Sequence, residues 1–245
     1  MPGVDRSTGS GSIRGILFDK DGTLFDFASM WEPAYREAVA ALAAAAGDAA
    51  LAQRLLTRAG QDMETGRIDP ASPLACGSID EIIALWRAEP ALAAVDDCAE
   101  RVHDIFRRHA TGTARPVTDL AALFRRLRRR GLRLGVATLD TTANARQSLD
   151  RAGVAGMLDF IAGYDAGFGA KPDPRVVHAF ATHTGLASAE LAVVGDAVSD
   201  LSMARAAGVG LAVGVLTGVS PRAALEPLAD HVLDSVAGLE ALLCR

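Results

Sequence analysis

The segment Ile13-Arg14-Gly15-Ile16-Leu17-Phe18-Asp19-Lys20-Asp21-Gly22-Thr23 begins as an apolar run and ends in two acids separated by one lysine. An apolar run of this length, bounded by an acidic turn that contains glycine, predicts a buried strand over residues 13–18. Two carboxylates this close together repel each other unless a cation or a proton lies nearby. Because Asp and Gly also favour ordinary turns, a purely structural turn is the alternative interpretation.

Two regions with different secondary-structure patterns follow this strand. Residues 30–112 carry helical periodicity, with a capping box that starts at Ser78 and an irregular stretch over residues 60–77. After residue 112, helical segments alternate with short apolar runs. The strands expected there are 132–138, 159–162, 191–195, 209–215 and 231–233. This alternation predicts an α/β fold with a Rossmann-like, mostly parallel sheet covered on both faces.

The position of the helical block predicts how the chain is divided. It lies between the first strand and the remaining strands, so we expect an all-helical cap domain inserted into the core. The expected core comprises residues 13–29 and 113–245, and the expected cap comprises residues 30–112. Residues 1–12 are rich in Gly and Ser, which predicts a disordered N-terminal segment.

Composition narrows the classes of function. The 245-residue chain has a formal net charge of −5, which argues against a nucleic-acid partner. The arginine run over residues 125–130 falls at the end of a predicted helix, where cations complement the helix dipole. The three cysteines lack the spacing of metal ligands, which favours free thiols in a reducing compartment. With neither a signal peptide nor a long apolar run, we expect a cytoplasmic protein without a membrane partner, as a monomer or homodimer.

A second acidic pair follows another predicted strand. Asp196 comes directly after residues 191–195, and Asp200 lies four residues further on. On their own these acids would suit a helix N-terminus. The carboxyl ends of parallel strands meet at one edge of a sheet, however, so Asp196 and Asp200 are expected beside Asp19 and Asp21. Carboxylate oxygens gathered in this way predict a Mg²⁺ site.

Two further residues suggest phosphate binding. Thr138 ends the predicted strand 132–138, where its hydroxyl could hold a phosphoryl oxygen or simply cap the next helix. Lys171 is one of only two lysines, against 23 arginines, and it precedes a predicted helix start. A compact ammonium group suits the neutralisation of a carboxylate and a phosphate together.

With these residues in view, the sequence resembles the haloacid-dehalogenase (HAD) superfamily in its phosphatase branch, and more loosely the phosphoglycolate-phosphatase-like members. The four motifs stand in the order typical of that family. They are Asp19-Lys20-Asp21-Gly22-Thr23, Thr138, Lys171, and Gly195-Asp196 through Asp200. The resemblance runs from about residue 13 to the C-terminus, and it implies a HAD-like core with a helical C1-type cap.

The resemblance implies a hydrolase mechanism on these residues. Asp19 would attack phosphorus and become an aspartyl-phosphate, and Asp21 would act as general acid and base. Thr138 and Lys171 would bind the phosphoryl group. The expected activity is a Mg²⁺-dependent hydrolysis of a small soluble phosphate ester, with phosphoglycolate as the leading candidate.

The same resemblance implies the metal ligands. Mg²⁺ would be held by Asp19, the main-chain oxygen of Asp21 and Asp196, with Asp200 acting directly or through water. Two positions depart from common family choices. Lys20 stands where an aliphatic residue is frequent, and Ala197 stands where a small hydroxyl residue is frequent.

The same motifs are compatible with activities other than a phosphatase, and the sequence separates some of them. A phosphonoacetaldehyde hydrolase needs a lysine in the cap, and residues 30–112 contain none. A phosphomutase of the same superfamily stays open, as does a non-catalytic phosphate-binding or receiver-like regulatory protein. The receiver-like reading suits the chain poorly, because such modules are shorter and lack a helical insert.

Specificity is expected to come from the cap. Arg67, in the irregular stretch, is the candidate for contacting a second anionic group of the substrate, with an ordinary surface arginine as the alternative. Trp31, Trp86 and Phe106 are expected to pack the interior of the cap rather than to touch substrate. The five histidines show no ligand spacing, and we expect none to be catalytic.

Overall fold

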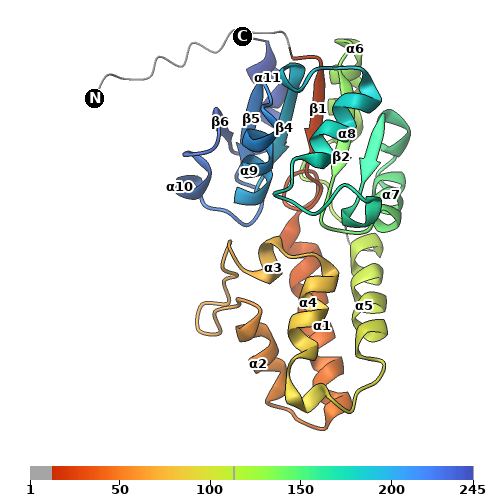
Figure 1. The fold of residues 1–245 in the computed structure, drawn as a ribbon, viewed down its shortest axis with the longest axis vertical. Helices are drawn as coiled ribbons and strands as arrows, with labels where there is room; N and C mark the ends of the chain where they lie inside the picture. The colour runs from red at the N-terminus through yellow and green to blue at the C-terminus, as the bar shows by residue number, and fades with distance from the viewer. Residues whose placement is uncertain (1–12, 113, 245) are drawn as a thin grey trace.

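The computed structural model describes residues 13–112 and 114–244, so the predicted disorder of residues 1–12 lies outside the described residues. Its centre is a six-stranded sheet in the order β3-β2-β1-β4-β5-β6, and every adjacent pair of strands is parallel (Figure 1). The strands are β1 (Gly15–Phe18), β2 (Arg133–Ala137), β3 (Phe160–Ala162), β4 (Leu191–Gly195), β5 (Leu211–Val215) and β6 (His231–Leu233). The predicted α/β fold is therefore confirmed.

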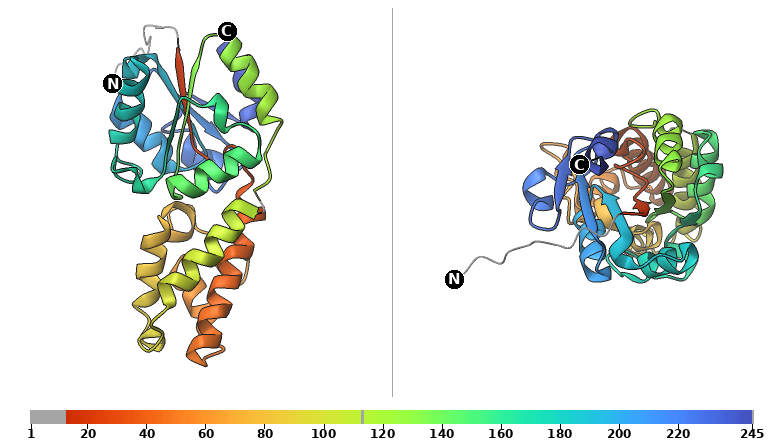
Figure 2. Two further views of the ribbon diagram at one scale, coloured as in Figure 1. Left: turned by 90° about the vertical axis from the view of Figure 1, so that its right-hand side faces the viewer. Right: turned by 90° about the horizontal axis from the view of Figure 1, so that it is seen from above.

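Helices cover both faces of this sheet, as the alternation of strands and helices predicted (Figure 2). Successive side chains of a strand point to opposite faces. Ile16 and Phe18 of β1 accordingly pack with α6 (Leu120–Arg129) and α11 (Leu239–Leu243). Leu17 belongs to the other face, which is covered by three further core helices. These are α8 (Arg175–Thr184), α9 (Val198–Ala207) and α10 (Arg222–Leu225).

The helical insertion after β1 forms a separate body beyond the carboxyl ends of the strands (Figure 1). It comprises α1 (Phe27–Ala46), α2 (Leu51–Arg58), α3 (Pro73–Cys76), α4 (Ile79–Arg87) and α5 (Cys98–Gly112). Its own apolar core is built around an aromatic cluster in which the rings of Trp31, Tyr35 and Trp86 all contact Phe106. The predicted capping box is present at the start of α4, where Ser78 and Glu81 bond reciprocally.

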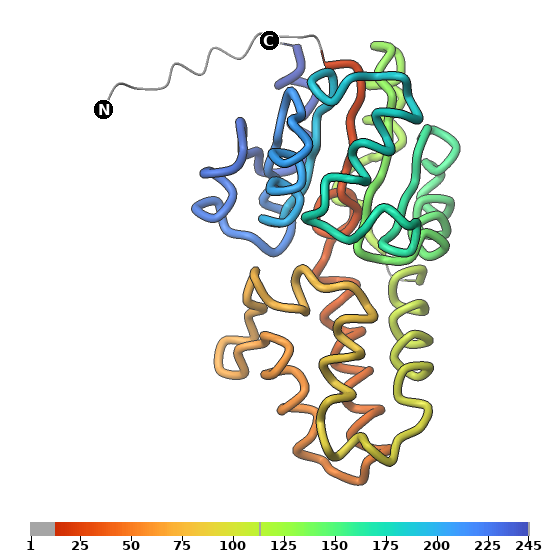
Figure 3. Tube along the Cα trace, viewed as in Figure 1, coloured from red at the N-terminus to blue at the C-terminus, as the bar shows by residue number. Residues whose placement is uncertain are grey.

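The chain crosses between core and cap at two neighbouring places (Figure 3). Phe25 and Pro116 form an antiparallel bridge there, and the Asp26 N–H donates to the Arg115 carbonyl over 2.8 Å. The first cap helix begins at Phe27, three residues before the boundary expected from the sequence. The two crossings tie the base of the cap directly to the segment that follows Asp21.

Of the remaining elements, one helix contributes Leu149 to the same apolar cluster as Ile16 and Phe18, and the others are short 3₁₀ turns. Helix α7 (Thr142–Arg151) follows β2 and contacts α5 of the cap. The 3₁₀ turns are η1 (Pro90–Leu92), η2 (Ala155–Met157), η3 (Tyr164–Ala166), η4 (Ser188–Glu190) and η5 (Val236–Gly238). Within residues 13–112 and 114–244, no helix combines the length and the apolar character needed to cross a bilayer.

Candidate active site

The register of the central strands brings distant residues to one edge of the sheet. Phe18, the last residue of β1, pairs with Val136 of β2 and with Val194 of β4. The residues that follow these strands therefore leave the sheet at nearly the same level. Asp19 follows β1 directly, Thr138 follows β2 and Asp196 follows β4. All three are buried.

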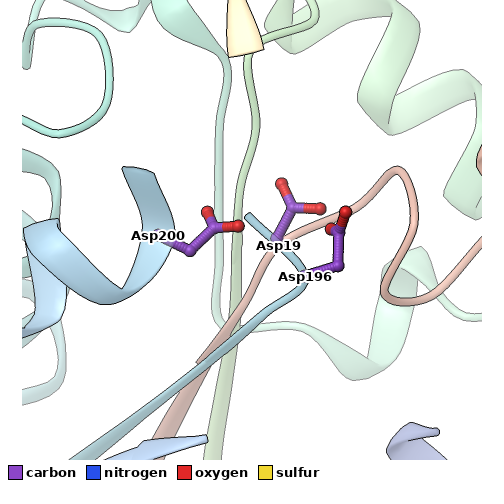
Figure 4. A group of neighbouring side chains, drawn as sticks. All are labelled: Asp19, Asp196 and Asp200. Carbon is purple, nitrogen blue, oxygen red and sulfur yellow. The ribbon is translucent and has the colours of Figure 1, made fainter. Parts of the chain in front are cut away.

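Asp19, Asp196 and Asp200 form a compact group of carboxylates (Figure 4). Each offers one oxygen, and these three oxygens lie within 4.8 Å of one another. Burial raises the pKa of Asp19 from its ordinary value of 3.8 to about 7; Lys171 opposes the rise, and the charges of Asp200 and Asp21 add to it. Burial likewise raises the pKa of Asp196, and the charges of Asp19 and Asp200 add to that rise.

The loop after β5 and the turn after β1 hold Asp196 from two sides. Thr23 Oγ donates to Asp196 Oδ1 over 3.2 Å, and the Val219 N–H donates to Oδ2 over 2.9 Å. Glycine is required at the closest approach, because a Cβ on Gly218 would lie 1.8 Å from Asp196 Oδ2. A Cβ on Gly22 would lie 2.5 Å from the same oxygen, and Gly22 also has a φ of +89°. The glycine of the first motif thus permits the carboxylates to converge.

Lys171 reaches the acidic group from the loop between β3 and α8. Its Nζ forms an ion pair with Asp19 Oδ1, and it lies 2.6 Å from Asp200 Oδ1. The lysine side chain is almost completely buried. Although burial lowers the pKa of Lys171, the charges of Asp19 and Asp200 outweigh it and raise that pKa. Lys171 therefore stays charged beside the carboxylate that the sequence assigned as nucleophile.

Lys20, whose role the sequence left open, is fully buried below the site. Its Nζ lies 2.8 Å from Asp21 Oδ1 and 3.1 Å from Asp140 Oδ2. Burial lowers the pKa of Lys20, but Asp21 and Asp140 outweigh it and raise that pKa above its ordinary value. Asp140 was missed by the sequence analysis. The sequence signal for Asp140 was weak, because an acid at this position, just before α7, is also common at an ordinary helix N-terminus.

Thr138 is oriented by its neighbours in the same loop. Its Oγ accepts a hydrogen bond of 3.1 Å from the Asp140 N–H, which leaves the hydroxyl proton for a further acceptor. The Thr138 N–H itself is engaged by the Ala162 carbonyl over 3.0 Å. Of the two groups on Thr138, only the hydroxyl could therefore bind a phosphoryl oxygen.

The donor set fits a divalent cation of the hard, oxygen-binding kind. Asp19 Oδ2 is buried and lacks a hydrogen-bond partner among the described residues. Five carboxylates gather here (Asp19, Asp21, Asp140, Asp196 and Asp200), and two ammonium groups face them. If all were ionised, negative charge would exceed positive by three. Oxygen ligands with an excess of negative charge are what Mg²⁺ prefers.

A narrow cavity lies over this group, between the strand ends and the cap. Asp19, Asp21, Thr138 and Lys171 line its core side. The cap contributes apolar side chains, among them Trp31. The expected packing of Trp31 inside the cap is confirmed, because its ring centroid lies 5.5 Å from that of Phe106. Trp31 lines the cavity as well.

The structure does not bring Arg67 to this cavity. Arg67 is exposed, and it lines a separate cavity between residues 65–70 of the cap and the loop of residues 216–222 after β5. The two cavities share Phe27, which stands between them. Arg67 lies in an irregular loop, so the sequence did not indicate which of the two cavities beside Phe27 its side chain would line.

Comparisons with known proteins agree with this arrangement. Residues 13–208 match the family model of haloacid dehalogenase-like hydrolases. The chain is 27% identical to a phosphoglycolate phosphatase of Pectobacterium atrosepticum over 233 residues, 95% of this chain and 93% of that protein. It is 30% identical to the "Probable phosphatase IndB" of Dickeya dadantii over 206 residues, 83% of this chain and 81% of that one.

The same fold occurs in the crystal structure of a predicted phosphoglycolate phosphatase from Haemophilus somnus. The two structures superpose with a TM-score of 0.71 at 19% identity, over 96% of this chain and 99% of that one.

Proposed function

The chain belongs to the haloacid dehalogenase-like hydrolase family, and from this premise we propose that it is a Mg²⁺-dependent phosphatase of small phosphate monoesters. The observation that carries the proposal is the ion pair of Lys171 with Asp19 inside the group of three buried aspartates. A charged lysine and a convergent carboxylate group suit a phosphoryl group, which brings its own negative charge to the site.

Asp19 is proposed as the nucleophile. One of its oxygens forms a bond to phosphorus while the bond between phosphorus and the ester oxygen breaks, which leaves an aspartyl-phosphate. Lys171 neutralises charge on the nucleophile and the phosphoryl oxygens, and the Thr138 hydroxyl donates to a phosphoryl oxygen.

Asp21 is proposed as general acid and then general base. It lines the cavity beside Asp19, and burial raises its pKa, although Lys20 opposes that rise. As an acid it gives its proton to the departing alkoxide. As a base it takes a proton from the water that attacks phosphorus, so that inorganic phosphate leaves and Asp19 is restored.

Asp19, Asp196 and Asp200 are the side chains that would hold Mg²⁺, together with the main-chain oxygen of Asp21. When bound, the ion supplies positive charge to the phosphoryl oxygens in the transition state. The burial of these carboxylates and the unpartnered Asp19 Oδ2 support this assignment.

The substrate class expected from the sequence is phosphoglycolate-like, and the relatives that bear the name phosphoglycolate phosphatase support a small phosphate monoester as the substrate. The test is hydrolysis of p-nitrophenyl phosphate with Mg²⁺ and with EDTA. We expect release of p-nitrophenol that requires the metal and disappears in Asp19→Asn. Metal-independent turnover, or full turnover by Asp19→Asn, would remove the proposal.

A further inference from the structure

The wall of the active-site cavity opposite the catalytic carboxylates comes from the cap, and it is apolar. Phe27, Trp31 and Tyr35 of α1 form one part of it. Leu74 of α3 with Ile79 and Ile82 of α4 forms the other. A phosphate ester held by Lys171 and Thr138 would direct its organic group toward this wall, because the strand ends occupy the remaining side.

Among the described residues that line the cavity, Tyr35 is the one that brings a hydroxyl from the cap, and this hydroxyl is already committed. The Tyr35 hydroxyl donates to the Leu74 carbonyl over 2.6 Å, so it is satisfied within the cap. Lys171 is the one cation among the described residues that line the cavity, and it is paired with Asp19 and Asp200. The cap wall thus offers a substrate apolar contact and no counter-ion.

Two arginines of the cap lie on the other side of Phe27. Arg36 and Arg67 line the separate cavity on the other side of Phe27. A carboxylate on the leaving group would therefore be desolvated against aromatic and aliphatic side chains without a cation.

We propose that this site prefers monoesters whose leaving group is uncharged and apolar, a short alkyl or aryl alcohol, over esters that carry a second anion such as phosphoglycolate. The inference rests on the proposed phosphatase activity and specifies its substrate class. The narrowness of the cavity restricts the leaving group to a small one.

The test measures kcat/KM of the wild-type protein, in the presence of Mg²⁺, for three esters of nearly equal shape. Phosphoglycolate carries the carboxylate, phosphoglycolamide replaces it with a neutral amide, and isobutyl phosphate replaces it with an apolar branch. We expect kcat/KM for isobutyl phosphate to exceed that for phosphoglycolate by at least about tenfold, with the amide between them. Phosphoglycolate as the best of the three would overturn the inference.

The two proposals fail in different ways in this experiment. If p-nitrophenyl phosphate is hydrolysed but phosphoglycolate is preferred among the three esters, the substrate class is wrong and the phosphatase stands. If none of the esters, including p-nitrophenyl phosphate, is hydrolysed, the phosphatase itself is wrong and the substrate class falls with it.

A matched pair of variants tests the physical cause. Ala75 lines the cavity from α3 and is only half-buried, so it can accept a longer side chain. Ala75→Arg supplies the missing cation, and Ala75→Met supplies similar bulk without charge. We expect the preference for phosphoglycolate over isobutyl phosphate to rise at least about tenfold in Ala75→Arg relative to Ala75→Met. If both variants fold and show the same ratio of kcat/KM for phosphoglycolate to kcat/KM for isobutyl phosphate, the inference is wrong. If either variant fails to fold, the comparison of the three esters with the wild-type protein decides the inference.

Discussion

Lys20 and Asp140 form an ion pair that is fully removed from solvent, with Nζ 3.1 Å from Oδ2. The same Nζ lies 2.8 Å from Asp21 Oδ1, so one ammonium group joins two carboxylates. Asn144 completes the arrangement by donating to Asp140 Oδ1 over 2.9 Å. The lysine of the first motif therefore connects the turn after β1 to the turn after β2.

Replacing Lys20 should destabilise the protein. Lys20→Met removes the cation and leaves Asp21 and Asp140 buried without it, a change that typically costs about 3–5 kcal/mol in the free energy of unfolding. Urea denaturation monitored by circular dichroism measures this loss. The double variant Lys20→Met/Asp140→Asn removes one of the stranded charges, so it should recover part of the stability. A Lys20→Met protein with an unchanged free energy of unfolding would show that the pair is not structural.

The roles of Asp19 and Asp21 should be distinguishable by whether the aspartyl-phosphate forms and how fast it is hydrolysed. p-Nitrophenolate leaves without needing a proton, so Asp21→Asn should still form the aspartyl-phosphate but hydrolyse it about 10²–10⁴ times more slowly. Rapid mixing with p-nitrophenyl phosphate should then show a burst of one p-nitrophenol per protein.

The same rapid-mixing experiment on Asp19→Asn is the control, because that variant lacks the attacking carboxylate and should show no burst. A burst in Asp19→Asn, or its absence in Asp21→Asn when slow turnover persists, would contradict the assigned roles.

The buried carboxylates should make the stability of the metal-free protein fall as pH rises. The pKa of Asp19 is about 7 in the folded protein and near 3.8 when the chain unfolds. Between these values the folded state binds the proton more strongly, so Asp19 stabilises at low pH and loses this contribution as pH rises toward 7. The slope is about 1.4 kcal/mol per pH unit at most for one carboxyl.

Mg²⁺ should reverse this trend, because it binds the ionised carboxylates and replaces their protons. Melting temperatures measured with EDTA and with Mg²⁺ between pH 4.5 and 8 test this, and the increase caused by the metal should grow with pH. Asp19→Asn lacks the titrating group and should show a shallower dependence in EDTA. A metal effect that is constant across the range would rule out this origin.

Removing Arg67 should leave catalysis almost unchanged. Its side chain is exposed and lines the cavity beyond Phe27, so Arg67→Ala should alter kcat/KM by no more than about twofold. Steady-state kinetics on the best substrate provide the measurement. Trp31→Leu is the comparison, because Trp31 lines the active-site cavity, and its kcat/KM should fall further. If kcat/KM falls as far in Arg67→Ala as in Trp31→Leu, Arg67 does take part in substrate binding and this prediction is wrong.

Much of the architecture followed from local patterns. The apolar run before Asp19 and the alternation of strands and helices after residue 112 predicted the parallel sheet, and strands 191–195 and 231–233 were placed to the residue. Ser78–Glu81 predicted the start of α4 because capping is a contact between near neighbours. The irregular stretch 60–77 concealed the short helix α3, which has too few residues to show periodicity.

The sequence places Asp19 and Asp196 directly after predicted strands. The carboxyl ends of parallel strands meet at one edge of a sheet, so the convergence of these two acids was predictable from the order of the strands along the chain. Three other features of the site depend on the tertiary structure. The partner of Lys20 depends on a buried contact with Asp140, whose turn follows a different strand. The side of Phe27 on which Arg67 lies, and the apolar wall that Trp31 presents to the cavity, depend on how the cap packs over the sheet. Such contacts join residues far apart in the chain, and no periodicity or motif encodes them.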